Sequence, residues 1–194
     1  NMNKQRICIV GDGLSGLTTA IVLSQVPGVE VNLIAKKTSK NFDKRTTAIS
    51  DANFKFIKEN ITHIKRNLFW PSKNIELFYE TAKEKLNFLN LNEENSNLMY
   101  VFENDKIKNI LLKEISKKKI KIIRKEINNI KELKKYDLSI LCLGGNSEIY
   151  NKIINKRSIN KDYKEVAITG YIKHKFKRLN TSQFFLKEGP LAIL

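Results

Sequence analysis

The sequence has few of the residues from which disulfide frameworks, metal sites and acid–base catalytic groups are built. It contains two cysteines and two histidines among 194 residues, and the cysteines do not form a CxxC pair. A disulfide-rich secreted domain and a zinc site are therefore not predicted. Cys8 and Cys142 lie in apolar segments, which indicates buried thiols in a reducing compartment. His63 and His174 stand alone in polar or basic surroundings, so neither is predicted to be catalytic or to bind a metal.

Long apolar runs are absent as well. No stretch is long enough to span a membrane as a helix and none resembles a signal peptide, so we expect a protein that is cytoplasmic or peripheral at a membrane surface. Acidic residues are in the minority: 20 Asp and Glu against 36 Lys and Arg give a net charge of +16. The lysines are spread along the chain and are not interleaved with aromatic residues in a nucleic-acid-binding motif. Nucleic acid is therefore not an expected partner, whereas attraction to acidic lipid stays open.

Glycine is scarce, with eight residues, but three of them lie in one turn. The apolar run Ile7–Val10 predicts a strand buried on both faces, and it leads into Gly11-Asp12-Gly13-Leu14-Ser15-Gly16 before an apolar helix. In a dinucleotide-binding turn, Gly11 permits the tight turn, Gly13 lets the backbone approach a pyrophosphate, and Gly16 lets helix and strand pack closely. The phosphates would lie on the free amides and the positive dipole of the helix N-terminus. We therefore predict cofactor binding by Gly11, Gly13, Leu14, Ser15 and Gly16, with a purely structural turn as the alternative.

The segment after this helix completes the unit. Val29–Ile34 predicts a second strand, which gives a strand–helix–strand unit of the expected length. A dinucleotide site usually has an acidic residue at the end of this strand, where it binds ribose hydroxyls. Ala35 stands there instead, followed by Lys36 and Lys37. Ribose recognition by an acid is therefore missing from this position, and Lys36 is predicted to meet a phosphate.

The next segment is polar and basic and predicts a loop that continues to residue 50. Ser50 or Asp51 can cap a following helix, in which Phe54 and its apolar neighbours recur at helical spacing, and Pro71 ends that helical region. Arg45 is the informative residue of the loop, because a guanidinium beside a nucleotide site offers fixed donors to a phosphate. An ordinary solvated arginine is the alternative.

Strand and helix patterns continue to the end of the chain. Residues 75–79 and 86–89 predict a hairpin that begins a second sheet, and residues 99–104 introduce a helix with Ile107, Ile110, Leu111 and Ile115 on one face. Short strands are predicted at 120–123 and 127–130. Residues 137–143 predict a buried strand that ends at Gly144, and its carboxyl end is either a ligand site or an unoccupied turn. Further strands are predicted at 166–172, 184–186 and 191–194.

These patterns predict an α/β fold. We expect a Rossmann-like dinucleotide-binding domain with a parallel sheet, formed by residues 1–72 and 97–162. Residues 73–96 and 163–194 are expected to form part of a second, mainly antiparallel substrate-domain sheet. The chain stops inside an apolar segment, so we expect it to be the N-terminal portion of something longer.

The order of these landmarks resembles the flavin-dependent aromatic hydroxylases of ubiquinone biosynthesis. These belong to the class A flavoprotein monooxygenases, with the 4-hydroxybenzoate hydroxylase fold. Residues 11–16 resemble the family's opening FAD fingerprint, and 45–50 resemble its segment whose arginine contacts FAD. Residues 100–104 match its helix start, 137–147 are similar to its second nucleotide motif, and 185–194 resemble a strand pair of its substrate sheet. The resemblance implies FAD binding by Arg45, Asn104 and Gly144 in addition to the glycine turn.

The resemblance also implies an activity. An enzyme of this family uses NAD(P)H and O2 to hydroxylate the aromatic ring of a prenylated quinone precursor, and because FAD carries the reaction no catalytic side chain is predicted. Three departures bear on this: Ala35 replaces a ribose-binding glutamate, Leu143 replaces an aspartate, and the later Gly-Asp-Ala motif is not in the chain. We expect the chain alone to bind FAD weakly and to show no turnover. One alternative is a non-catalytic scaffold of a quinone-synthesis assembly, and another is an oxidoreductase that shares only the first strand–helix–strand unit.

Overall fold

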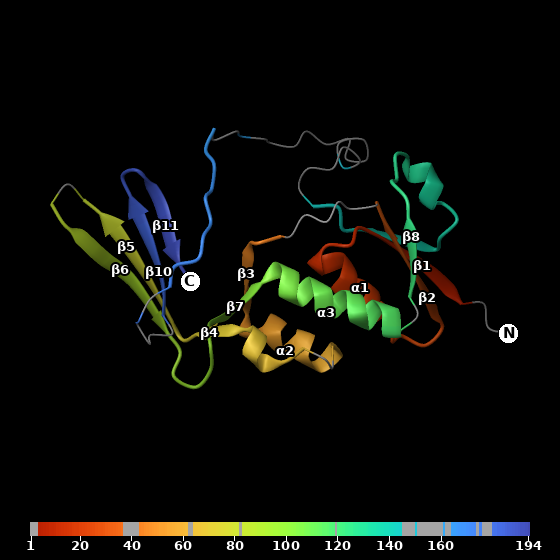
Figure 1. The fold of residues 1–194 in the computed structure, drawn as a ribbon, viewed down its shortest axis with the longest axis horizontal. Coiled ribbons are helices and arrows are strands. Elements are labelled where there is room, and N and C mark those ends of the chain that lie inside the picture. Colours follow the sequence, from red (N-terminus) through yellow and green to blue (C-terminus); the bar gives the residue numbers. More distant parts are fainter. Residues whose placement is uncertain are drawn as a thin grey trace. The chain divides into compact units, whose positions relative to one another are not determined.

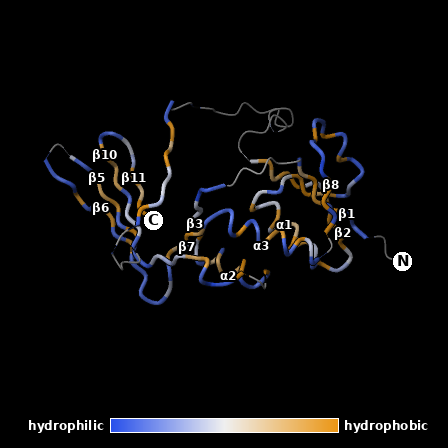
Figure 2. The backbone as a smooth tube through the Cα atoms, viewed as in Figure 1, coloured by the Kyte–Doolittle hydropathy of each residue, from blue (hydrophilic) through white to orange (hydrophobic). Residues whose placement is uncertain are grey.

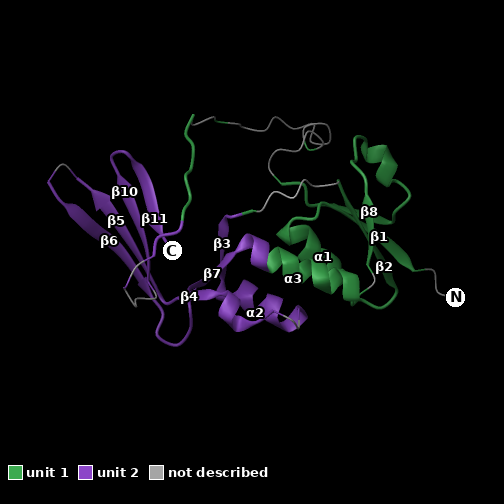
Figure 3. Ribbon diagram, in the orientation of Figure 1, with its two compact units in different colours: residues 1–43, 107–170 green, residues 44–106, 171–194 purple. Residues whose placement is uncertain are grey.

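The computed structural model divides the chain into two compact units, which are described separately. It describes residues 4–36, 43–61, 64–81, 83–118, 120–144, 150, 161, 164–173, 175 and 180–194. Unit 1 comprises residues 1–43 and 107–170, and unit 2 comprises residues 44–106 and 171–194 (Figure 3). Figure 1 labels most of the helices and strands. The domain bounds predicted from the sequence stay a prediction.

Unit 1 is built on a four-stranded sheet in which every pair of neighbours is parallel (Figure 1). The strand order is β8-β2-β1-β9. The strands are β1 (Gln5–Val10), β2 (Val29–Ala35), β8 (Lys121–Arg124) and β9 (Leu138–Leu141), and α1 (Leu14–Leu23) follows β1. Together with the largely antiparallel sheets of unit 2, this confirms the predicted α/β fold class.

The core of unit 1 lies on both faces of its two central strands. Figure 2 shows β1 and β2 as largely hydrophobic segments. Cys8 and Val10 of β1 pack with Ile34 of β2 in one apolar cluster, which Ile127 and Leu133 complete. The alternate residues of both strands are buried as well, and α1 packs against β1 and β2. Burial on both faces explains why these strands are unbroken apolar runs.

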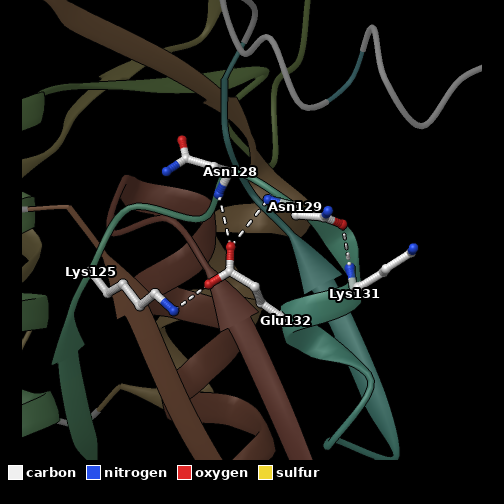
Figure 4. Close-up of polar contacts among 5 residues, drawn as sticks. All are labelled: Lys125, Asn128, Asn129, Lys131 and Glu132. Atoms are coloured by element: carbon white, nitrogen blue, oxygen red, sulfur yellow. Dashed lines mark hydrogen bonds and ion pairs between the residues drawn. The ribbon is translucent and has the colours of Figure 1, made fainter.

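The segment after β8 is a correction to the sequence prediction. Residues 127–130 were expected to form a strand, but Ile127 lies in irregular chain and η2 (Ile130–Leu133) is a 3-10 helix. Its start is fixed by a capping box (Figure 4). The Asn129 side chain accepts a hydrogen bond from the backbone N–H of Lys131, at 2.9 Å, and the Glu132 carboxylate accepts from the N–H of Asn129, at 3.1 Å. This local hydrogen bonding competes with strand pairing and stops the chain from extending β8.

Helix α3 (Asn104–Lys117) confirms the helix predicted there. Ile107, Leu111 and Ile115 are buried at helical spacing, all in the part that belongs to unit 1. Basic Lys117 lies in the last turn, where a cation is favoured by the helix dipole.

Unit 2 contains a three-stranded antiparallel sheet that the sequence did not predict. Its order is β3-β7-β4, with β3 (Thr46–Ser50), β7 (Met99–Glu103) and β4 (Trp70–Ser72). Residues 46–50 were expected in a loop, which is wrong, and residues 99–103 were expected only to introduce the following helix. Pro71 lies within β4 and does not end a helix; it is tolerated because β4 is an edge strand.

Aromatic rings form the core beside this sheet. Helix α2 (Asp51–Asn60) follows β3, and the Ser50 side chain caps it by accepting a hydrogen bond from the Asn53 N–H, as predicted. Phe54 of α2 stacks on Tyr100 of β7 with ring centroids 3.8 Å apart. Phe69, which follows the 3-10 helix η1 (Arg66–Leu68), meets Phe54 and Phe102 edge to face.

The second sheet of unit 2 has four strands in the order β11-β10-β5-β6. These are β5 (Asn74–Glu80), β6 (Lys85–Asn92), β10 (Asn180–Leu186) and β11 (Gly189–Ile193). The predicted hairpins β5–β6 and β10–β11 are confirmed as antiparallel pairs, and β10 joins them by pairing parallel to β5. The two hairpins therefore share one sheet, contrary to what an oxidoreductase sharing only the first strand–helix–strand unit would show. The strand expected at residues 166–172 is not formed, and Ile168 there is 94% exposed.

Candidate functional site

The candidate site in unit 1 is the turn that joins β1 to α1. Gly11 has φ +115°, a backbone conformation that favours glycine, and its N–H donates to the Ile34 carbonyl at 2.8 Å. The segment after the neighbouring strand β9 also contacts the start of the turn, because the Cys142 N–H donates to the Val10 carbonyl at 2.7 Å. The turn therefore rests on the carboxyl ends of β2 and β9, the edge where open α/β sheets bind ligands.

Two of the three glycines of the turn are required by packing inside the protein. A Cβ at Gly11 would lie 2.1 Å from the Cys142 carbonyl oxygen, and a Cβ at Gly16 would lie 2.0 Å from the Gly11 carbonyl oxygen. Both distances are far shorter than any tolerated contact, and the atoms met belong to the backbone, which cannot swing away.

Gly13 is different, because the protein itself does not require a glycine there. Its φ of −72° and ψ of 177° suit any residue. Within the part of the chain that the structure describes, no atom other than those of its chain neighbours lies within 4 Å of a Cβ built at this position. The missing side chain leaves open the approach to the start of α1.

The first amides of α1 lie at this open position. Gly13 is the N-cap residue of the helix and has no side chain to cap it, and the first turn carries no acidic residue. The amides of Leu14 and Ser15 precede the first helical hydrogen bond, which Leu17 N–H makes to the Gly13 carbonyl at 3.0 Å. Free amides and a positive dipole at a position without side chains fit a pyrophosphate. The residues present thus fit the phosphate part of a dinucleotide.

Gly144 lies on the same sheet edge. It follows β9, which pairs with β1, and its φ of +72° and exposed position fit a turn at the strand's carboxyl end. Ser147, the second residue that carried the resemblance in this segment, lies outside the described residues.

The structure shows what surrounds Ala35 at the end of β2, where a dinucleotide site usually has an acid. Ala35 is buried, and Lys36 forms an exposed ion pair with Glu126, at 2.8 Å. Next to Ala35 lies Arg124 on β8, whose guanidinium Nη1 is 2.8 Å from the Asp12 carboxylate. Asp12 and Arg124 were missed as site residues because they are 112 positions apart in the sequence, and no local pattern signals the pair.

In unit 2 the structure brings together the two residues for which flavin contacts were predicted. The Asn104 N–H donates to the Arg45 carbonyl, at 3.0 Å, and the Thr47 hydroxyl donates to Asn104 Oδ1, at 2.6 Å. Asn104 is buried where β7 passes into α3, whereas Arg45 is exposed at the start of β3. The antiparallel pairing of β3 with β7 creates this proximity between residues far apart in the sequence.

The two thiols of unit 1 are structural. Burial raises the pKa of Cys8 to about 11, and burial also raises the pKa of Cys142, so both are protonated at neutral pH and poor nucleophiles. His63 and His174 lie outside the described residues. In the described ranges, no three His, Cys, Asp or Glu side chains gather to hold a metal ion, and no helix is both long and apolar enough to cross a membrane.

Three comparisons with known proteins were made, and one of them found matches. No protein-family model matches the chain. No curated protein matches it. Solved structures with similar folds include p-nitrophenol 4-monooxygenase PnpA from Pseudomonas putida DLL-E4, with 16% identity over 62% of this chain and 32% of that chain, and a TM-score of 0.48. A second is 2-methyl-3-hydroxypyridine-5-carboxylic acid oxygenase, with 16% identity over 62% of this chain and 31% of that chain, and a TM-score of 0.47. A third is CtdE in complex with FAD, with 21% identity over 61% of this chain and 29% of that chain, and a TM-score of 0.43.

The chain spans about a third or less of the length of these proteins. Likenesses of this degree do not assign an activity to the chain.

Proposed function

We propose that the turn formed by residues 11–16 binds the pyrophosphate of FAD. The observation that carries this proposal is the contrast among its glycines. Gly11 and Gly16 are required by contacts inside the protein, whereas the position of Gly13 is open. A glycine that the fold does not need, beside free helix amides, is explained by a ligand whose phosphates approach the backbone closely.

We further propose that the chain is the nucleotide-binding part of a flavin-dependent monooxygenase, with a prenylated aromatic quinone precursor as its substrate. The order of the sequence segments supports this, as does the proximity of Arg45 to Asn104. Both residues are proposed to contact FAD, together with Lys36 and Gly144. FAD supplies the redox chemistry when bound, with NAD(P)H as reductant and O2 as oxidant. The protein's part is to hold the cofactor, exclude water and orient the ring.

A second candidate function is a non-catalytic component of a quinone-synthesis assembly, which acts at the surface of a membrane or within a complex. Buried Ala35 favours it, because the usual ribose-binding acid is missing from the end of β2. The visible spectrum of the purified full-length protein that contains this chain, after incubation with excess FAD, distinguishes the monooxygenase from the non-catalytic component. Bound flavin absorbance supports the monooxygenase, and its absence supports the scaffold.

The phosphate site is tested by Gly13→Ala. A methyl group at this open position leaves the fold unchanged, because nothing described in the protein is near it, but it occupies the approach to the amides. Quenching of flavin fluorescence should show a Kd for FAD raised by roughly tenfold or more, equivalent to at least ~1.4 kcal/mol. FMN, which lacks the pyrophosphate bridge and the adenosine, should bind equally weakly to the wild-type chain and to Gly13→Ala.

Gly170→Ala is the matched control, since Gly170 is exposed and has no described atom near its Cβ position. It should change neither the Tm nor the Kd. Unchanged FAD affinity in Gly13→Ala would refute the phosphate site, and a lowered Tm would show that the residue has a structural role instead.

A further inference from the structure

The carboxylate of Asp12 has an unusual place for a residue inside a phosphate-binding turn. It does not cap the helix that follows; it pairs with two cations from other elements. Its Oδ2 is 2.8 Å from Arg124 Nη1, and its Oδ1 is 4.0 Å from Lys108 Nζ of α3. Only 13% of its side-chain surface is exposed, so water screens its hydrogen-bonded ion pair with Arg124 little.

The sheet order determines where this pair lies. Asp12 follows β1 and Arg124 ends β8, and β2 runs between those two strands. Because neighbouring strands are about 4.8 Å apart, the two side chains can meet only by reaching across the carboxyl end of β2. Ala35 is that end, and it is the register partner of Arg124. The Asp12–Arg124 pair therefore spans the carboxyl end of β2, the place from which a dinucleotide-binding fold normally presents an acid to the adenosine ribose.

The carboxylate also retains capacity to accept hydrogen bonds. An ionised carboxylate accepts at about four positions. Arg124 occupies one of them on Oδ2, and Lys108, at 4.0 Å from Oδ1, is beyond hydrogen-bonding distance. Oδ1 therefore has accepting positions that neither cation fills.

We propose that Asp12, positioned by Arg124 and Lys108, accepts the hydrogen bond of the adenosine ribose 2′-hydroxyl in place of the acid missing at residue 35. This inference rests on the proposed function of the turn, and it names the ribose end of that same site. It also states a specificity. A ribose with a free 2′-hydroxyl is accepted, whereas a 2′-phosphate would bring a second anion against the Asp12 carboxylate.

The ligand can test the residue directly. With the full chain, we would measure Kd by calorimetry for ADP and for 2′-deoxy-ADP, which differ by one hydroxyl. A hydrogen bond to a charged acceptor is worth roughly a tenfold change in Kd or more, so ADP should bind at least that much more tightly. Asp12→Asn should weaken ADP to the level of 2′-deoxy-ADP and leave 2′-deoxy-ADP within about twofold of its wild-type Kd.

The matched control is Asp137→Asn. Asp137 lies in the same unit at the opposite edge of the sheet, where its carboxylate accepts from the Arg6 N–H at 2.7 Å. This variant should keep the preference for ADP. The wild-type comparison of the two ligands remains decisive even if Asp12→Asn folds poorly.

The outcomes separate this inference from the proposed function. If ADP and 2′-deoxy-ADP bind equally to the wild-type chain, the role of Asp12 is wrong while the phosphate site stands. Tighter binding of 2′-phospho-ADP-ribose than of ADP-ribose would also overturn the role of Asp12, and would assign Arg124 and Lys36 to a phosphate. No measurable ADP binding would overturn the proposed function and this inference with it.

Discussion

The point that a Cβ of residue 16 would occupy lies 2.0 Å from the carbonyl oxygen of Gly11. Helix α1 therefore starts in direct contact with the turn that precedes it, and the closeness depends on the absence of one methyl group. The arrangement holds the start of the helix against the sheet edge, where the amides of Leu14 and Ser15 are available.

Gly16→Ala should be among the most damaging single substitutions in unit 1. The methyl group would have to displace backbone, so we expect a loss of about 3 kcal/mol in the free energy of unfolding, measured by urea denaturation. Gly170→Ala, at an open position, should stay within ~0.5 kcal/mol of wild type. A loss at Gly16 no larger than this would mean that the turn can relax and that the close contact is unimportant.

The aromatic core of unit 2 should depend strongly on Phe69. Its ring is buried and meets Phe54 at 5.0 Å and Phe102 at 5.4 Å between centroids. Phe69→Ala should lower the free energy of unfolding by about 3–5 kcal/mol. Phe56→Ala, which removes an exposed ring from the same neighbourhood of the chain, should cost no more than about 0.5 kcal/mol. Equal losses for the two variants would contradict the core described for this unit.

The buried Cys8 thiol should make the fold sensitive to alkaline pH. Its pKa is raised from 9.0 to about 11 in the folded chain, so above pH 9 the unfolded chain releases its proton first and stability falls until the pH passes the folded value. The full loss from this one thiol is about 2–3 kcal/mol. Cys8→Ala, although less stable at neutral pH, should lose correspondingly less between pH 8 and 11 in denaturant titrations. Parallel curves for the two chains would show that other groups cause the alkaline loss.

The capping carboxylate of Glu132 should act at the other end of the pH scale. Its pKa is lowered by the Lys125 ammonium and by the N–H groups of Asn129 and Asn128. The stabilisation is thus present above the ordinary pKa of 4.5 and is lost as the pH falls through the lowered value. Glu132→Gln should show a smaller fall in Tm on acidification than wild type, and Lys125→Met should show part of that change. An acid transition unaltered by Glu132→Gln would contradict this.

The sequence predicted the parallel sheet and its turn because their signals are local. Ile7–Val10 and Val29–Ile34 are uninterrupted apolar runs, the pattern of strands covered on both faces, and the glycine spacing is contained in six residues. The β3-β7-β4 sheet was missed because its signals are weak. Residues 46–50 contain one large apolar side chain, and residues 99–103 run directly into a helix that masks them.

Pairing between distant segments could not be predicted either. Residues 166–172 have the composition of a strand, but composition does not show whether an edge is available to pair with, and here none of the described strands pairs with them. The same holds for the Asp12–Arg124 pair, which depends on β8 lying beside β2. A sequence pattern identifies which residues can form a strand. The order of the strands in the sheet depends on which distant segments pair when the chain folds.

The parallel pairing of β5 with β10 has a consequence for how the protein is made. Asn74 and Asn180 are register partners 106 positions apart, so β5 leaves the ribosome long before the strand that will cover its edge. At about 5–20 residues per second, that interval is on the order of 5–20 s. During it the β5–β6 hairpin, with Leu77 opposite Leu89, has the outer edges of both strands unpaired and is only marginally stable by itself. The nascent chain must therefore carry the open edge of β5 while the residues between β5 and β10 are made.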